Sequence, residues 1–252
     1  MTVSGTAADD RFEFSAAASR RLTVKGVEYN FTDAEVTAVT FDGLGGNDSI
    51  TVDGGPGVSL RADGFRSVTA TATAGGQKVA RLYDSDGNET FTAYPTYAVL
   101  ANGTTYSNRA NDFRFVMAYA NQGGNDSAAL LDCEGNDTLT TTPTYGTMTG
   151  KWRPEGASVD RSFYNRANYF DQVVAASSGG TDLARFFDSA FKDVFTLRAD
   201  SKDAVMTGSG YVNQALKFRY VYATATTGGD EASLYDSPGD DKSYTSGNVA
   251  RL

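Results

Sequence analysis

The chain has 252 residues, a formal net charge of −9, and 31 acidic side chains against 22 basic ones. This balance argues against a nucleic-acid partner, because the phosphate backbone selects basic grooves, and it permits cation binding. Histidine is absent and cysteine occurs once, so the chain has neither the commonest general base nor an internal disulfide, and no apolar run reaches the length of a membrane span.

Residues 1–64 form a variant of the pattern that follows. The segments 5–12 and 41–50 each place a turn before a short strand, without the register of the later repeats. Terminal repeats are often atypical because they cap a stack of units. We therefore predict that residues 1–64 are variant N-terminal coils.

A regular repeat begins at Phe65. Phe65, Phe113, Phe170 and Phe218 are separated by 48, 57 and 48 residues, and each opens a strand in which apolar and polar positions alternate. A glycine pair follows each strand and supplies a turn with positive φ. We expect these four phenylalanines to be buried in one stacked column.

Each glycine pair is followed by a turn of the Leu-Tyr-Asp-Ser type. The turn occurs at 82–89, 130–137, 186–193 and 234–241, and it places Asp84, Asp132, Asp188 and Asp236 at separations of 48, 56 and 48 residues. A strand and a turn are expected at 91–97 and 139–145, and a further recurrent segment lies at 106–111, 163–168 and 211–216. A unit of about 48 residues therefore carries four or five short strands.

This arrangement predicts an all-β chain folded as a right-handed parallel β-helix (a β-solenoid) built from 48-residue two-coil repeats. Residues 1–252 form a single domain in this interpretation, with variant coils over 1–64 and regular repeats over 65–252. The alternative is a pair of antiparallel sandwich domains, which do not need a constant repeat.

The motifs resemble known repeats. Leu-Tyr-Asp-Ser-x-Gly, Pro-Thr-Tyr, Asn-Arg-Ala-x-x-Phe and Ala-x-x-Gly-Gly-x-Asp resemble tandem repeats in very large secreted or surface proteins of planctomycete bacteria. The segment 43–48 also resembles hemolysin-type (RTX) calcium repeats, but its glycine spacing differs and the nonapeptide is not tandem. The resemblance implies an extracellular or cell-surface, non-catalytic β-solenoid segment of a larger protein.

The candidate metal ligands are Asp84, Asp132, Asp188 and Asp236. Each could join the second carboxylate of its own turn, and hard cations need several oxygens. These second carboxylates are Glu89, Asp137, Asp193 and Asp241. The alternative is that each Asp-Ser pair closes a turn, with the aspartate accepting backbone N–H groups. We expect no cofactor, with calcium as the ion that this pattern permits.

An insertion near 150–161 breaks the period once and contains the single tryptophan. Insertions in repeat proteins map to surface loops, often on the binding face. Trp152, with Lys151, Arg153 and Tyr164, is therefore the candidate carbohydrate-binding group. The alternative is that the Trp152 ring folds back to cover a coil.

Two further slots recur. Tyrosines shared between units could stack on sugars, although repeated rings usually fill a core. These tyrosines are Tyr83 and Tyr235 in one slot, and Tyr97 and Tyr145 in another. Asparagines shared between units are expected to hydrogen-bond along the stack, as amide ladders do. They are Asn108, Asn165 and Asn213.

We expect a structural spacer, an adhesin-like segment or a carbohydrate-binding module rather than an enzyme. The expected partners are a polysaccharide or cell-surface glycan and the other domains of the parent protein. The alternative is a polysaccharide lyase or glycoside hydrolase of the parallel β-helix type, which works without histidine. Such a site would interrupt the repeat in several adjacent coils, and the sequence has one interruption.

Overall fold

The computed structural model describes residues 1–15, 20–32, 35–36, 38–42, 44, 48–54, 59–63, 66–72, 79–153, 156, 158–239, 244–246 and 249–251. Throughout these residues the regular elements are β-strands, which form two long sheets and one short sheet. No helix in this part of the chain is long and apolar enough to cross a membrane. The predicted all-β class is confirmed.

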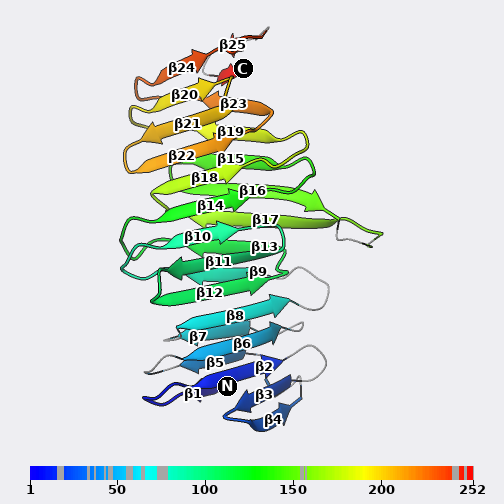
Figure 1. The fold of residues 1–252 in the computed structure, drawn as a ribbon. Helices are drawn as coiled ribbons and strands as arrows, with labels where there is room; N and C mark the ends of the chain where they lie inside the picture. The colour runs from blue at the N-terminus through cyan, green and yellow to red at the C-terminus, as the bar shows by residue number, and fades with distance from the viewer. Residues whose placement is uncertain are drawn as a thin grey trace.

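The larger sheet has 14 strands, and the strands are stacked side by side along the length of the molecule (Figure 1). In spatial order they are β24 (Glu231–Tyr235), β20 (Val194–Arg198), β21 (Asp203–Gly208), β22 (Tyr211–Leu216), β18 (Gln172–Ala176), β14 (Ser127–Leu131), β10 (Thr90–Ala93), β11 (Tyr97–Asn102), β12 (Tyr106–Asn111), β8 (Ser67–Ala72), β6 (Ser49–Gly54), β2 (Arg11–Ser15), β3 (Arg20–Val24) and β4 (Val27–Phe31).

The second long sheet has nine strands, and a three-stranded sheet lies in the N-terminal part of the chain. The order in the nine-stranded sheet is β25 (Tyr244–Ser246), β26 (Val249–Arg251), β23 (Tyr220–Thr224), β19 (Leu183–Phe187), β15 (Thr138–Thr142), β16 (Tyr145–Trp152), β17 (Arg161–Asn168), β13 (Phe115–Tyr119) and β9 (Val79–Tyr83). The short sheet contains β1 (Thr2–Ser4), β5 (Ala38–Asp42) and β7 (Ser59–Asp63).

The repeat consists of two single strands followed by a three-stranded antiparallel meander. Unit 1 (residues 65–112) contains β8, β9 and the meander β10–β12, and unit 2 (113–169) contains β13, β14 and the meander β15–β17. Unit 3 (170–217) contains β18, β19 and the meander β20–β22, and β23 and β24 begin unit 4. A unit therefore has five strands, at the upper end of the expected number.

Consecutive units start on opposite sheets. Within a unit the chain crosses between the long sheets once after each single strand and once after the meander, so it makes three crossings and ends on the other sheet. Strand β18, which follows Phe170, therefore lies in the 14-stranded sheet, and β23, which follows Phe218, lies in the nine-stranded sheet. The prediction of one phenylalanine column is wrong for this reason. Phe170 and Phe218 are buried, Phe113 is half-buried, and Phe65 lies outside the described residues.

Pairing is parallel between units and antiparallel inside each meander. Strand β14, for example, pairs in parallel with β10 of unit 1 and β18 of unit 3. The meanders follow from short connections, since Pro143 and Thr144 alone separate β15 from β16, and a link of two residues closes a hairpin but cannot return a chain to a parallel strand. The long, mostly parallel sheets were predicted. Strands β5 to β8 pair with their neighbours in parallel alone, whereas each of units 1 to 3 adds an antiparallel meander that was not predicted.

The core lies between the long sheets, as the alternation of apolar and polar residues requires. In β14 and β18 every second residue is buried, and Leu130 and Ala175 are fully inaccessible to solvent. The main cluster of buried side chains extends from Ala80 to Ala223. A second cluster, around the edge-to-face contacts of Phe41 with Phe12 and Phe14, fills the N-terminal part.

The predicted insertion is a longer hairpin. Strands β16 and β17 have eight residues each, against six in β11, β12, β21 and β22. Their connection covers residues 153–160, whereas 103–105 and 209–210 suffice in the other units. This hairpin projects beyond the edge of the stack (Figure 1).

Candidate functional site

Three clusters of carboxylates recur at the turns between the sheets. The oxygens that the members of a cluster contribute lie within 4.8 Å of one another. The clusters are a first triad of Asp84, Glu89 and Asp126, a second triad of Asp132, Asp137 and Asp182, and a third triad of Asp188, Asp193 and Asp230. In each triad the first residue follows a strand on one sheet and the second precedes a strand on the other, while the third comes from the next unit.

The sequence predicted two members of each triad. Asp84 and its turn carboxylate Glu89 are together, as are their counterparts in units 2 and 3. The third member was missed, although a signal exists: Asp126 stands two residues after the pair Gly123-Gly124, in the Gly-Gly-x-Asp motif. Asp236 is exposed and belongs to no triad among the described residues, and Asp241 lies outside them.

The third carboxylate of each triad accepts a backbone N–H from the second. The N–H of Glu89 donates to Oδ1 of Asp126 at 2.7 Å, and the N–H of Asp137 donates to Oδ1 of Asp182 at the same distance. The corresponding distance from Asp193 to Asp230 is 2.9 Å. Each of these bonds joins residues of neighbouring units and therefore ties the units together.

The first carboxylate also accepts from a neighbouring unit. Asp84 accepts the N–H of Gln122 at 2.8 Å, and Asp132 accepts the N–H of Ser178 at 2.9 Å. Asp188 accepts from the N–H and the hydroxyl of Thr226. The aspartates therefore accept backbone N–H groups, as the turn-closing alternative requires, but the donors belong to the next unit rather than to the same turn.

A small side chain donates to the second carboxylate from four residues before it. The hydroxyls of Ser85 and Ser189 donate to Glu89 and Asp193, and the thiol of Cys133 lies 3.2 Å from Oδ2 of Asp137. Burial raises the pKa of the Cys133 thiol to about 12, with further contributions from Asp137 and Asp132. The thiol is therefore protonated at neutral pH and acts as a weak donor in the serine slot.

The hairpin residue that faces the second carboxylate differs with the length of that carboxylate side chain. In unit 2, Gly150 faces Asp137, and in unit 3, Gly208 faces Asp193; a Cβ at either position would overlap the aspartate. In unit 1 the corresponding residue is Asn102, whose Nδ2 donates to Oε1 of Glu89 at 2.9 Å. Glycine therefore accompanies aspartate, and asparagine accompanies the glutamate.

An aromatic residue lies beside each triad, on the strand paired with the residue that faces the second carboxylate. It is Tyr106 in unit 1, Phe163 in unit 2 and Tyr211 in unit 3. The Tyr211 hydroxyl donates to Oδ1 of Asp193 at 2.7 Å. Burial, together with the neighbouring carboxylates, raises the pKa of both tyrosine hydroxyls well above the usual value.

Burial makes the triads costly when fully ionised. It raises the pKa of Asp126 to about 6, with Glu89 and Asp84 adding to the rise, and it raises the pKa of Asp137 to about 6, with Asp132 and Asp182 adding to it. The pKa of Asp132 is also raised, chiefly by burial. Within the described part of the chain no lysine or arginine forms an ion pair with a triad carboxylate.

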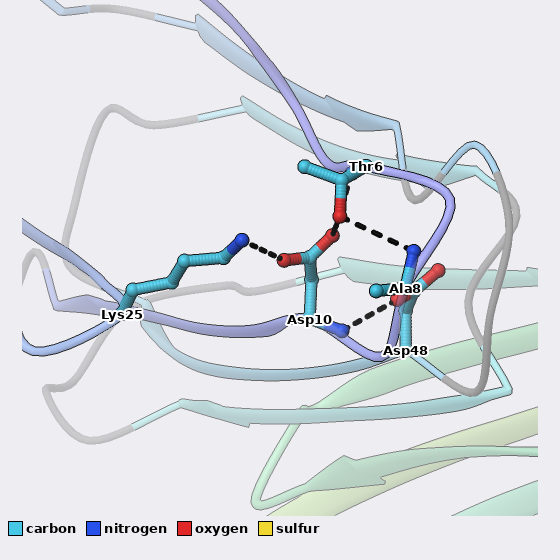
Figure 2. Close-up of polar contacts among 5 residues, drawn as sticks. All are labelled: Thr6, Ala8, Asp10, Lys25 and Asp48. Atoms are coloured by element: carbon cyan, nitrogen blue, oxygen red, sulfur yellow. Dashed lines mark hydrogen bonds and ion pairs between the residues drawn. The ribbon is translucent and has the colours of Figure 1, made fainter.

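The N-terminal turn has the same framework with a different charge (Figure 2). The N–H of Asp10 donates to Oδ1 of Asp48 at 2.8 Å, and the Thr6 hydroxyl donates to Oδ2 of Asp10. Gly5 replaces the first carboxylate, and the ammonium of Lys25 lies 3.1 Å from Oδ1 of Asp10. The pKa of Asp10 is lowered, first by the hydrogen bonds from Thr6 and then by Lys25, in contrast to the triads.

The predicted carbohydrate-binding residues do not share one face. Trp152 stands four residues after the fully buried Met148 on the core side of β16, and its half-buried ring packs against the main core. Lys151 is exposed, and Tyr164 lies on the outer side beside Phe115, with ring centroids 5.8 Å apart. Arg153 forms an ion pair with Asp160 at 2.7 Å inside the hairpin loop.

The repeated tyrosines have ring faces covered by other side chains of the chain. Tyr83 stacks on Tyr119 with centroids 5.1 Å apart, and arginine guanidinium groups lie 3.8–4.5 Å from the other three ring centroids. These pairs are Arg109 over Tyr97, Arg166 over Tyr145 and Arg198 over Tyr235. The asparagines differ from the expected ladder, because Asn165 and Asn213 donate to the carbonyls of Tyr94 and Thr142, each 71 residues earlier.

Comparison of the chain with models of protein families, with curated proteins and with solved structures finds no match. Inference of function therefore rests on the geometry of the chain itself. Among the described residues, the triads and the covered tyrosines are the recurrent chemical features of this geometry.

Proposed function

We propose that this chain is a non-catalytic structural spacer, a β-solenoid segment of a larger extracellular or cell-surface protein. The observation that carries the proposal is the use of its reactive side chains. Carboxylates at the turns accept N–H groups from the preceding unit, and tyrosine rings are covered by residues of neighbouring strands. Side chains engaged in this way hold the stack together and leave few groups to act on another molecule.

The pairing supports a length that depends on the number of units. Two consecutive units contribute five strands to each long sheet, so one unit advances the stack by about 12 Å at a strand spacing of ~4.8 Å. Each unit also pairs with its immediate neighbours through the same contacts, as β10 with β14, β15 with β19, and β20 with β24. Stability in such an array is close to a sum over units and their interfaces.

Carbohydrate binding is the second candidate. It is favoured by the exposure of Tyr83, at 57%, on the outer face of the nine-stranded sheet. The stacked contact with Tyr119 occupies one face of that ring, so a sugar would have a single small platform there. Glycan-array binding that is lost in a Tyr83→Ala variant would support this function, and retention of binding would remove it.

A lyase or hydrolase has less support. Paired carboxylates about 5 Å apart are used by retaining glycosidases, and the triads have comparable spacing. The triads are nevertheless repeated in three successive units and lie against backbone N–H groups, whereas a catalytic pair is expected once and beside an open cleft. Release of reducing ends from polysaccharides by the purified chain would establish this alternative.

Deletion of one whole unit tests the spacer function. Removal of residues 170–217 joins Tyr169 to Phe218, and the junction is matched because Tyr169 and Lys217 both have φ of 64°. We expect a folded, monomeric protein whose longest dimension in small-angle X-ray scattering is shorter by about 12 Å. The remaining units would continue on the opposite sheets with equivalent contacts.

A half-unit deletion is the matched control. Removal of residues 170–193 takes out two single strands and leaves their meander, so β20 would follow β17 without a crossing. We expect this variant to lose cooperative unfolding. A whole-unit deletion that fails to fold, or a half-unit deletion that folds equally well, would show that the five-strand unit is not the element that sets the length.

A further inference from the structure

The second carboxylate of each turn has one oxygen whose contact differs among the four turns. In the N-terminal turn, Oδ1 of Asp10 contacts the Lys25 ammonium. In the third triad, Oδ1 of Asp193 accepts the Tyr211 hydroxyl, and in the second, Oδ1 of Asp137 faces the Cys133 thiol. The corresponding Oε2 of Glu89 in the first triad is buried and has no hydrogen-bond partner among the described residues.

Two further oxygens near Glu89 are buried and lack a hydrogen bond. Oδ1 of Asp84 is buried and makes no hydrogen bond within the described chain, and the buried Tyr106 hydroxyl faces Glu89 without forming a hydrogen bond to it. No triad oxygen of the second or third cluster is left in this way. Since Glu89 is only 1% exposed, leaving its oxygen without a partner costs free energy that a positive ligand would recover.

We propose that the first triad binds a calcium ion through Glu89, Asp84 and Asp126. Its place corresponds to that of the Lys25 ammonium in the N-terminal turn, where the same framework holds a positive charge against the second carboxylate. The proposal is independent of the spacer function, because an ion there would stabilise the stack whatever the stack carries.

The ligand set favours calcium over magnesium. Magnesium is usually held by one or two carboxylates and keeps several waters in a near-ideal octahedron, whereas calcium takes about six to eight oxygens in a flexible geometry. The triad oxygens lie within 4.8 Å of one another, a separation that two ligands of one calcium ion at about 2.3–2.6 Å can reach. Asp84 is half-buried, whereas Glu89 and Asp126 are buried, so the Asp84 side of the triad is the one nearest to solvent.

Calcium titration of chelator-treated protein tests the site. We expect calcium to raise the melting temperature by several degrees and to bind with measurable heat, because a ligand that binds only the folded state stabilises it by mass action. Glu89→Gln keeps the shape and the acceptor for Ser85, and we expect it to weaken calcium binding at least tenfold. Asp193→Asn is the matched control in the third triad, and we expect it to leave calcium affinity unchanged.

Terbium luminescence provides a second readout. Tyr106 lies beside the triad and would sensitise a bound Tb³⁺ ion, so Tyr106→Phe, which copies Phe163 of unit 2, should remove much of the signal while calcium still competes for the site. If Glu89→Gln does not fold, Asp84→Asn is used with the same expectation. The proposal is overturned if calcium changes neither heat nor melting temperature of the parent protein, or if both carboxylate variants bind calcium as the parent does.

Discussion

The backbone N–H of Asp137 donates to Oδ1 of Asp182 at 2.7 Å, and the two residues, both 1% exposed, belong to neighbouring units. The same carboxylate accepts the Ser177 hydroxyl through Oδ2 at 2.6 Å. Burial of the Asp182 carboxylate costs free energy, but the carboxylate supplies the acceptor that the buried N–H of Asp137 needs.

Substitution of Asp182 separates these two effects. Asp182→Asn removes the charge and keeps an acceptor oxygen, whereas Asp182→Ala removes both. We expect the alanine variant to be less stable than the asparagine variant by about 1–3 kcal/mol, the cost of an unpaired buried N–H. Urea denaturation in EDTA at pH 7 measures the difference. Equal stability of the two variants would mean that the hydrogen bond contributes nothing.

The raised pKa values predict that stability increases as the pH falls toward 5. The pKa of Asp137 and of Asp126 is about 6 in the folded chain, against about 3.9 for an unfolded aspartate. Between these values the folded state holds more protons than the unfolded state, so the free energy of unfolding falls as the pH rises through this range.

Denaturation in EDTA from pH 7.5 to pH 5 checks this sign, and Asp137→Asn should flatten the dependence. At lower pH the trend reverses, because the pKa values of Asp10 and Glu35 are lowered in the folded state and the stability they contribute is lost on protonation. A steady loss of stability on going from pH 7.5 to pH 5 would contradict the buried, protonatable triads.

Gly150 is required by its neighbours. A Cβ at this position would overlap Oδ1 of Asp137 and come within 2.8 Å of the Phe163 ring, so we expect Gly150→Ala to cost at least about 2 kcal/mol. Gly179→Ala is the control, because the nearest atom to its Cβ would be 3.9 Å away, and we expect a change within about 0.5 kcal/mol. Thermal and urea unfolding of both variants would distinguish crowding at Gly150 from a general effect of replacing glycine.

Trp152→Ala distinguishes the two roles of the hairpin. The half-buried ring packs against the main core, so we expect a loss of about 1–3 kcal/mol of stability, less than the ~3–5 kcal/mol for a fully buried tryptophan. Lys151→Ala, at an exposed position of the same strand, serves as the control. Unchanged stability with loss of binding to a polysaccharide would instead assign Trp152 to a ligand site.

Much of this fold could be predicted because its signals are local. The interval between Phe170 and Phe218 defined the unit, and the segment 139–145 indicated a strand and a turn, which the structure places at Pro143 and Thr144. The assignment of strands to sheets could not be predicted, because alternation in β18 and β23 shows that one face of each is buried without showing which sheet each joins.

The triads were predictable in part for a related reason. Asp84 and Glu89 are five residues apart in one turn, so their proximity follows from the turn itself. Asp126 joins them only because β14 pairs in parallel with β10, a contact between units that no local pattern encodes. The covering of Tyr97 and Tyr145 by arginines likewise depends on cross-strand register.

The odd number of crossings in a unit determines how such an array would display appendages. The long β16–β17 hairpin belongs to unit 2, whose meander lies in the nine-stranded sheet, whereas the meanders of units 1 and 3 lie in the 14-stranded sheet. Long hairpins grafted at the same slot of adjacent units would therefore emerge alternately from the two sides. Those on one side would recur every second unit, about 24 Å apart. Duplication of single units would thus give a bifacial scaffold, and a one-sided row of projections would require changes in every other unit.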